Sequence, residues 1–206
     1  MSAEPQDEAV VRIVRTAERE FLRTGFSRVL MDDLAHELGM SKKTLYAHFA
    51  GKEALLRAVL EHRVSEIDRG LNALVMTGAA FPRKFRDVAQ FVQSRMAEVS
   101  PVFLADIRRH APECFAVVEE FRGRAIPRYF GQLIDEGVRA GCLDSGVNRD
   151  LLIRMLALSI QGIIRPEVVA DLQMHPSAAL DQILGIVFHG ILTPHGRRSC
   201  RPFPQS

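Results

Sequence analysis

Apolar residues recur at helical spacing along almost the whole chain, and this pattern limits the possible folds more than any other feature of the sequence. The clearest set lies near the N-terminus, at Val10, Ile13, Val14, Ala17 and Phe21. Its i, i+3, i+4 spacing predicts an amphipathic helix over residues 7–24. No stretch shows strand alternation, a hairpin signal or a repeat of about 20–50 residues. The sequence therefore predicts an all-α protein.

Glycines and prolines mark where the successive helices begin and end. Gly25 follows the first helix and is expected to take the left-handed conformation that ends many helices. A second, short helix ends at Gly39, and Ser41 can cap a third. The third is expected at about residues 42–48, and further helices at about residues 51–77, 82–99, 101–112, 113–140, 148–173 and 177–192. Pro127 is expected to kink the long helix, and Pro166 to bend the one after it.

Composition excludes several classes of protein. With 206 residues, 47% hydrophobic and 25% charged, the chain can bury a core and is not intrinsically disordered. Its most apolar stretch, residues 155–164, is too short to cross a bilayer, and no basic region precedes an apolar run at the N-terminus. The three cysteines, Cys114, Cys142 and Cys200, are an odd number and suit a reducing compartment. We therefore expect a cytoplasmic protein with no membrane partner.

Residues 34–49, LAHELGMSKKTLYAHF, have the pattern of two short helices joined by a tight turn. Gly39 supplies the turn, and Ala35 allows the two helices to approach closely. The side chains expected to share a small core with the first helix are Leu34, Leu38, Leu45 and Phe49. The outer face of the second of these helices then consists of Lys42, Lys43, Thr44, Tyr46 and His48.

The charge on this outer face has two interpretations. The net charge of the chain is only +2, so bulk charge does not by itself indicate a nucleic-acid partner. Lys42 and Lys43, however, lie in the first turn of a helix, where the helix dipole disfavours cations by a few tenths of a kcal/mol. A nearby DNA phosphate would reverse that penalty. The alternative is a solvated basic face with a half-buried structural Tyr46.

The stretches AEREFLRTGF, MDDLAHELGMSKKTLYAHF and KEALLRAVL make residues 13–60 resemble the TetR/AcrR family of bacterial transcriptional repressors. The resemblance covers about a quarter of the chain. It implies an all-α homodimer, with a three-helix helix-turn-helix DNA-binding domain at residues 1–51 and a larger helical ligand-binding and dimerisation domain at residues 52–193. Residues 194–206, which contain three prolines and three arginines, are expected to form a disordered tail.

The resemblance also implies which residues contact DNA. The family's phosphate-contacting tyrosine and lysine match Tyr46 and Lys52, and Lys52 stands at a helix N-terminus, which favours anions. Residues matching 42–44 face the major groove and its edges. The residue matching His48 often touches the DNA backbone, and a spacer role for His48 is the alternative. The implied DNA-binding residues are Lys42, Lys43, Thr44, Tyr46, His48 and Lys52.

Two positions depart from the family's pattern. The family usually has Thr or Ser where Leu30 stands, and that residue caps the second helix and often contacts a phosphate. Leu30 can do neither, so Asp32 or Ser27 is expected to supply part of the cap. Relatives often have Gly or Arg at the position of Lys43, where a lysine should add charge near the DNA.

Beyond the first domain the sequence is less specific. Phenylalanines are spread over the middle helices, where they form either a packed core or the wall of the apolar cavity that the resemblance implies. The candidate ligand-binding residues are Phe85, Phe103, Arg108, His110, Cys114, Phe121, Tyr129 and Gln161. His110 and Cys114 are four residues apart, but Pro112 lies between them and no second pair exists. We therefore expect no metal and no cofactor.

The last two long helices are apolar on more than one face, which is typical of helices that are buried or lie in an interface. In the family that the chain resembles, these helices pair with their mates as a four-helix bundle. The candidate dimer-interface residues are Leu152, Met155, Leu156, Ile183, Ile186 and Val187. A monomer core is the alternative.

These observations favour a ligand-responsive repressor. A homodimer would place two recognition helices in successive major grooves of a near-palindromic, double-stranded operator. We expect a small, largely apolar effector, neutral or weakly polar, although Arg108 and Arg165 could serve an anionic head group. The main alternative is an effector-independent architectural or division factor of the same fold. An enzyme or carrier is disfavoured, because the chain has no nucleophile–base signature, phosphate loop or ligand-spaced metal cluster.

Overall fold

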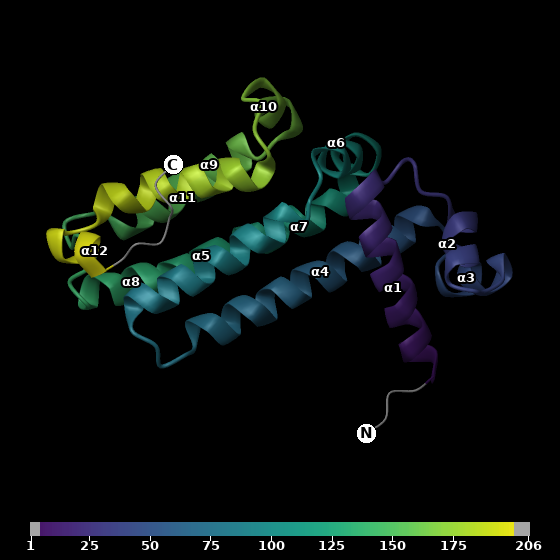
Figure 1. Ribbon diagram of the computed structural model, residues 1–206, viewed down its shortest axis with the longest axis horizontal. Helices are drawn as coiled ribbons and strands as arrows, with labels where there is room; N and C mark the ends of the chain where they lie inside the picture. The colour runs from purple at the N-terminus through teal and green to yellow at the C-terminus, as the bar shows by residue number, and fades with distance from the viewer. Residues whose placement is uncertain (1–4, 200–206) are drawn as a thin grey trace. The chain divides into compact units, whose positions relative to one another are not determined.

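The computed structural model confirms the all-α prediction and describes residues 5–199, with side chains from residue 8 onward (Figure 1). The helices are α1 (Pro5–Thr24), α2 (Met31–Glu37), α3 (Lys42–His48), α4 (Lys52–Val75), α5 (Phe81–Ala97), α6 (Pro101–His110), α7 (Pro112–Ala125), the π-helical turn η1 (Ile126–Phe130), α8 (Gly131–Arg139), α9 (Arg149–Ile163), α10 (Pro166–Asp171), α11 (Pro176–Ile191) and α12 (Pro194–Ser199). Within residues 5–199 there is no strand, and one isolated antiparallel bridge joins Leu143 and Leu192. None of the helices in this range has both the length and the apolar character that a membrane span requires.

Side-chain caps and left-handed glycines fix several helix ends. Ser41, Ser100 and Asn148 cap α3, α6 and α9, and each side chain accepts a hydrogen bond from the backbone N–H three residues later. Gly25 and Gly39 follow α1 and α2 with φ of +94° and +64°, a conformation that strains any residue with a β-carbon. The expected ends of the first two helices and the expected cap of the third are therefore confirmed.

Proline shapes the second half of the chain. Pro127 lies in η1, where the wider π-helical turn carries the helix past a residue that has no backbone N–H to donate. Pro166 has a larger effect than the expected bend, because the helix predicted over residues 148–173 is two helices, α9 and α10. The residue before a proline avoids the helical region, and Arg165 is accordingly extended, with φ −119° and ψ 143°.

The tail also differs from the sequence-based expectation, because residues 194–199 form α12 where disorder was expected. Thr193 fixes the start of this helix. Its backbone N–H donates to the Cys142 carbonyl (3.0 Å), and its hydroxyl accepts from the Gly196 N–H (2.9 Å). Gly196 packs so closely that a β-carbon there would lie 2.1 Å from the Cys142 carbonyl oxygen. The rest of the expected tail, residues 200–206, lies outside the described residues.

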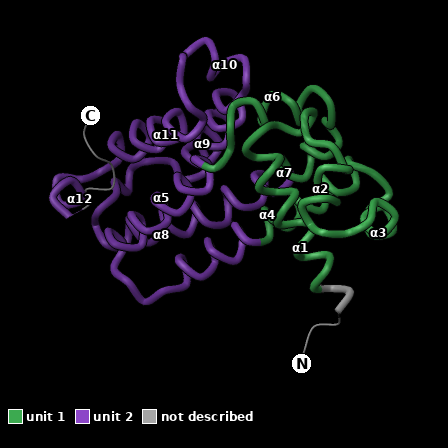
Figure 2. The backbone as a smooth tube through the Cα atoms, turned by 45° about the vertical axis from the view of Figure 1, so that its right-hand side comes forward, with its two compact units in different colours: residues 1–65, 98–119 green, residues 66–97, 120–206 purple. Residues whose placement is uncertain are grey.

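The chain divides into two compact units (Figure 2). Unit 1 consists of residues 1–65 and 98–119, and unit 2 of residues 66–97 and 120–206. Unit 1 therefore contains α1, α2, α3, the first part of α4, α6 and part of α7. It extends beyond the 1–51 segment that the sequence predicts as the DNA-binding domain. Helix α4 contributes residues to both units.

Each unit has its own apolar core. In unit 1, Phe21 packs edge-on against Phe26 with ring centroids 5.6 Å apart, and Leu45 of α3 is fully buried. In unit 2, Phe188 of α11 packs against Phe85 of α5 with centroids 4.3 Å apart. Burying one such side chain stabilises the folded state by about 1.5–3 kcal/mol. Packing in each core holds in position the helices that carry the polar side chains of that unit.

Candidate DNA-binding interface

Helices α2 and α3 form the helix-turn-helix that the sequence predicts. Gly39, in the left-handed conformation, makes the turn after α2. Arg12 of α1 donates to the Leu38 carbonyl at 3.1 Å and so satisfies a backbone acceptor at the end of α2. Leu34 of α2 and Leu45 of α3 are buried, with 1% and 0% of their surfaces exposed. Both helices therefore pack their apolar sides inward, and the orientation of α3 is fixed.

The outward side of α3 carries the polar residues predicted to contact DNA. Lys42, Lys43, Thr44 and Tyr46 are exposed, and His48 is partly exposed. Tyr46 has 47% of its surface exposed, which fits both a contact with DNA and the half-buried structural role considered for it. The structure thus places five of the six predicted DNA-binding residues around the outside of one short helix.

Two of these side chains already have partners within the protein. The Lys42 ammonium pairs with the Asp32 carboxylate of α2, which offsets its unfavourable position in the first turn of α3. The Thr44 hydroxyl lies 2.8 Å from the Ser41 hydroxyl, the cap of the same helix. Among residues 8–199, Lys43 has no ion-pair partner. Its charge is therefore available to a DNA phosphate.

Lys52, the sixth predicted residue, is engaged within the protein. From the start of α4 its ammonium donates to the backbone carbonyls of Phe26 (3.0 Å), Ser27 (3.1 Å) and Val29 (3.0 Å). An ammonium has three N–H donors, so these bonds use them all. The ammonium also lies 4.6 Å from the centroid of the Phe26 ring, and burial lowers the pKa of Lys52. Contact between Lys52 and a DNA phosphate stays a prediction. The three bonds to carbonyls favour a role for Lys52 in positioning the loop ahead of α2.

Helix α6 holds the same loop through Asp106. Its carboxylate oxygen Oδ2 accepts hydrogen bonds from the Ser27 N–H (2.9 Å) and the Ser27 hydroxyl (2.7 Å). Burial raises the pKa of Asp106, but the bonds from Ser27 outweigh burial, and the pKa lies below its ordinary value. A residue with a side chain could not replace Gly25, because a β-carbon there would lie 2.7 Å from this oxygen and 2.9 Å from Val102.

These contacts also change the expected capping of α2. Leu30 is the N-cap residue and makes no side-chain cap hydrogen bond, as its apolar side chain implies. The cap expected from Ser27 or Asp32 is not formed, because Ser27 bonds to Asp106 and Asp32 pairs with Lys42. The start of α2 is therefore held by the loop before it.

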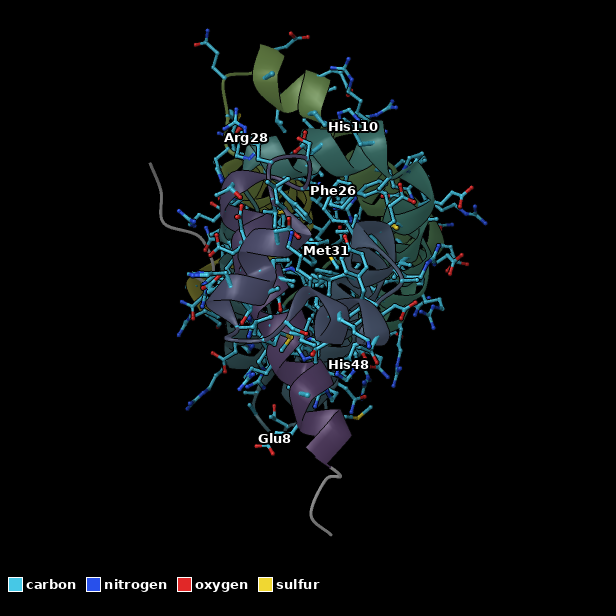
Figure 3. All side chains as sticks on the ribbon, turned by 90° about the vertical axis from the view of Figure 1, so that its right-hand side faces the viewer. Glu8, Phe26, Arg28, Met31, His48 and His110 are labelled. Atoms are coloured by element: carbon cyan, nitrogen blue, oxygen red, sulfur yellow. The ribbon has the colours of Figure 1, made fainter. Side chains whose placement is uncertain are left out.

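Lys52 and Asp106, here called the loop clamp, hold residues 25–29 ahead of α2. Asp106 was not predicted from the sequence, because 79 residues separate it from Ser27 and no local pattern marks such a pair. An open cavity of about 500 Å³ adjoins the clamp. It is lined by Phe26, Ser27, Gly51, Lys52, Glu53 and His110. In Figure 3, His48, at the end of α3, lies apart from Phe26 and His110, two residues that line this cavity.

Comparison with other proteins identifies this helix-turn-helix. Residues 13–59, from α1 into α4, match the family model of bacterial regulatory proteins of the tetR family. The chain belongs to the TetR family. It is 25% identical to the uncharacterized HTH-type transcriptional regulator YvaF of Bacillus subtilis, over 87% of this chain and 94% of that protein. It is 32% identical to the HTH-type transcriptional regulator EthR of Mycolicibacterium smegmatis over 84 residues, which are 40% of this chain and 39% of that protein.

Solved structures of other regulators share the fold. SmeT, the repressor of the Stenotrophomonas maltophilia multidrug efflux pump SmeDEF, superimposes with a TM-score of 0.64 and 16% identity, over 95% of this chain and 96% of that one. At this identity the likeness shows the fold alone. The predicted order, an N-terminal helix-turn-helix followed by a larger helical region, is confirmed. The chain is a TetR-family transcriptional regulator.

The eight residues predicted to bind a ligand are divided between the two units. Unit 1 contains Phe103, Arg108, His110 and Cys114, and unit 2 contains Phe85, Phe121, Tyr129 and Gln161. Phe103 and Cys114 are buried, and the Cys114 thiol, whose pKa is raised by burial, donates to the Glu53 carbonyl at 3.6 Å. The Arg108 guanidinium lies 5.3 Å from the centroid of the Phe115 ring. Phe103, Arg108 and Cys114 therefore take part in packing within unit 1.

The unit 2 members of this set differ in exposure. Phe85 and Tyr129 are buried, Phe121 is partly exposed and Gln161 is exposed on α9. The Tyr129 hydroxyl hydrogen-bonds to Asp68 of α4, 2.8 Å from its carboxylate and 3.1 Å from its carbonyl. Burial raises the pKa of Tyr129, and the contact with Asp68 raises it further. Tyr129 thus links η1 to α4, and the ligand set as a whole stays a prediction.

Half of the predicted interface residues lie inside the single chain. Leu152, Leu156 and Ile183 have 6%, 1% and 6% of their surfaces exposed. A helix packs only one stripe of its surface against a core, so an apolar helix can use other residues in an interface. For these three residues the monomer core, the alternative considered from the sequence, is what the structure shows.

The outer sides of α9 and α11 remain exposed in the single chain. Met155 and Ile186, both predicted interface residues, are 52% and 75% exposed, and Val187 is partly exposed. Leu151 and Leu158 were not selected from the sequence, yet they are 57% and 67% exposed. Their spacing with Met155 places all three on one face of α9. The two helices therefore present large apolar side chains to solvent.

Proposed function

We propose that this TetR-family protein is a repressor that binds a near-palindromic operator as a homodimer and releases it when a small, largely apolar effector binds. The main support for the proposal is the exposed side of α3. It presents Lys43 and Tyr46 on a helix whose orientation is fixed by buried leucines. Contacts of this kind to phosphates supply a large share of protein–DNA affinity. Repression is supported by SmeT, a repressor of the same fold.

The homodimer is supported by the exposed apolar face of α9 and α11. Leu151, Met155 and Leu158 lie along one face of α9, and Ile186 is the most exposed large apolar residue of α11. A contiguous exposed apolar patch marks an interaction site in most soluble proteins. A two-fold dimer through this face would bury these side chains against their symmetry mates. It would also present two copies of α3, which a near-palindrome requires about 34 Å apart.

The effector response is supported by the course of α4 through both units. In unit 1 Lys52, at the start of α4, holds the loop ahead of the helix-turn-helix. In unit 2 Asp68 of the same helix bonds to Tyr129. A ligand that alters the packing around Asp68 would act on the helix that carries Lys52. Such a ligand shifts the equilibrium only by its difference in affinity for the two states.

Self-association and DNA binding can be tested together. Leu158→Asp places a charge on the exposed face of α9, so it should prevent dimer formation and abolish binding to the DNA upstream of the gene. Met76→Asp is the matched control, because Met76 is similarly exposed, at 61%, but lies outside α9 and α11. Sedimentation velocity and fluorescence anisotropy measure the two properties. A wild type that sediments as a monomer at micromolar concentration would contradict the proposal.

A screen for operator release separates effector-dependent from effector-independent regulation. The proposal expects that apolar compounds which raise the melting temperature also lower the affinity for the upstream DNA. Specific, saturable DNA binding that no stabilising compound weakens would support the effector-independent alternative.

A further inference from the structure

Three side chains that can bind a metal ion come together from α1 and α4. His62 and Glu66 are four residues apart on α4, so they lie on one side of this continuous helix. Glu18 of α1 faces His62, and one ligand atom from each of the three residues lies within 4.8 Å of the other two. Divalent transition metals bind mixed sets of imidazole and carboxylate ligands of this kind.

The two oxygens of the Glu18 carboxylate have different neighbours. Oε1 accepts a hydrogen bond from the Arg63 guanidinium at 2.9 Å, and Oε2 lies 3.6 Å from Nδ1 of His62. This second distance is longer than an ordinary hydrogen bond of about 2.7–3.2 Å. It is close to the separation of about 3.3–3.4 Å between two ligands of a tetrahedral zinc ion, given bonds of about 2.0–2.1 Å. The distance therefore fits two ligands of one ion, and a protonated His62 paired with Glu18 is the alternative that needs no metal.

The surroundings of these ligands also suit a bound ion. The side chains of Glu18 and His62 are only 15% and 22% exposed, and the Nδ1 atom of His62 is buried. Arg63, with 8% of its side chain exposed, bonds to both Glu18 (2.9 Å) and Glu98 (2.8 Å) and so holds the Glu18 carboxylate in place. Metal-binding carboxylates are commonly oriented by such outer hydrogen bonds. Glu66 is partly exposed, so an ion can reach the group from solvent.

We propose that Glu18, His62 and Glu66 form a binding site for a divalent transition-metal ion of the Zn²⁺ type, with water completing its coordination. A bound ion cross-links α1 to α4 and stabilises the folded protein, because a site made by two helices does not exist in the unfolded chain. The expectation of no metal from the sequence considered only His110 and Cys114. Glu18 was not considered with the α4 pair, because it is distant from them in the sequence.

Zinc binding by the full chain tests the site. After metal is removed with a chelator, the wild type should bind one Zn²⁺ per chain in competition with a chromophoric chelator. Glu66→Gln keeps the shape of the side chain and removes its charge, so it should weaken zinc binding by at least about tenfold, as should His62→Asn. Glu61→Gln is the matched control, because Glu61 is exposed beside His62 on the same helix but is not one of the three ligands. It should bind zinc as the wild type does.

Two further readouts identify the ligands. Zinc should raise the melting temperature of the wild type and of Glu61→Gln, and should raise that of Glu66→Gln less, because stabilisation follows affinity for the folded state. Cysteine thiolates also bind zinc, so Co²⁺ is used as a spectroscopic probe of the ligand type. The proposed nitrogen and oxygen ligands should give visible absorption without the near-ultraviolet charge-transfer band of a thiolate.

Three results would overturn the proposal: no zinc binding by the wild type at micromolar metal, equal zinc affinity of the wild type and Glu66→Gln, or a thiolate band with Co²⁺. The first of these would leave the alternative, a protonated His62 paired with the carboxylates. If His62→Asn does not fold, Glu66→Gln decides alone. None of these measurements involves DNA, so the metal site is tested independently of the proposed regulatory function.

Discussion

The loop clamp of unit 1 and the Lys84–Glu136 pair of unit 2 use polar side chains in different ways. In unit 1 the side chains of the loop clamp bond to backbone groups, with Lys52 on three carbonyls and Asp106 on the Ser27 N–H. In unit 2 Lys84 and Glu136 bond side chain to side chain, as the buried Arg63 of unit 1 does with Glu18 and Glu98. Bonds to the backbone fix the path of a loop, whereas bonds between side chains fix the spacing of helices.

The units also differ in what they leave unsatisfied. The loop clamp of unit 1 uses all three donors of Lys52, so the loop ahead of α2 is held without help from another molecule. Unit 2 exposes the apolar face of α9. Under the proposed function, a second subunit covers this face.

The largest expected effect separates the two faces of α9. Leu156→Ala should lower the free energy of unfolding by about 2–5 kcal/mol, because Leu156 is 1% exposed and its removal leaves a cavity. Leu158→Ala, on the exposed face, should instead weaken self-association and change the unfolding of the single chain by less than about 0.5 kcal/mol. Denaturant unfolding at low protein concentration, combined with sedimentation, measures both. Equal effects of the two substitutions would remove the distinction between core and interface.

The next effect tests the close packing at the clamp. Gly25→Ala should destabilise unit 1 by more than about 2 kcal/mol, since it adds left-handed strain to contacts of 2.7 Å with Asp106 and 2.9 Å with Val102. Gly39→Ala is the matched control, because φ is also positive there but nothing lies within 4 Å of an added β-carbon. It should cost about 1–2 kcal/mol from strain alone. Calorimetric unfolding of both variants would show whether the difference exists.

A smaller effect depends on pH. The pKa of Asp106 lies below its ordinary value, so its carboxylate stabilises the folded protein above that ordinary value and loses this effect as the pH falls through the folded-state pKa. Asp106→Asn keeps the shape and removes the charge. The wild type should therefore be the more stable at pH 6–7, and the difference should shrink below about pH 4. A difference that is constant from pH 7 to pH 3 would mean that the charge does not contribute.

Much of unit 1 could be predicted from the sequence because its signals are local. The turn at Gly39, the cap at Ser41 and the outward side of α3 all lie within about three turns of helix, and each is confirmed. The bond between Asp106 and Ser27 could not be predicted, since it depends on how distant helices pack. For the same reason the bonds from Lys52 to the three carbonyls were not predicted.

Unit 2 was harder to predict because apolar periodicity does not tell a core from an interface. Leu156 and Leu158 are the same residue type two positions apart, and only packing against neighbouring helices such as α11 decides which of them is covered. The sequence predicted a bend at Pro166, but α9 and α10 are two separate helices. The cause is local, because the residue before a proline, Arg165, avoids the helical conformation.

The most direct test of the account compares Lys43 with Lys52 in a salt series of operator affinity. If α3 contacts DNA and the clamp only holds the loop, Lys43→Ala should reduce the salt slope by about 2 per dimer, one contact per subunit. Lys52→Met should lower the affinity and leave the slope unchanged. An unchanged slope in Lys43→Ala, or a slope reduced by about 2 in Lys52→Met, would contradict the account and restore Lys52 as the phosphate contact.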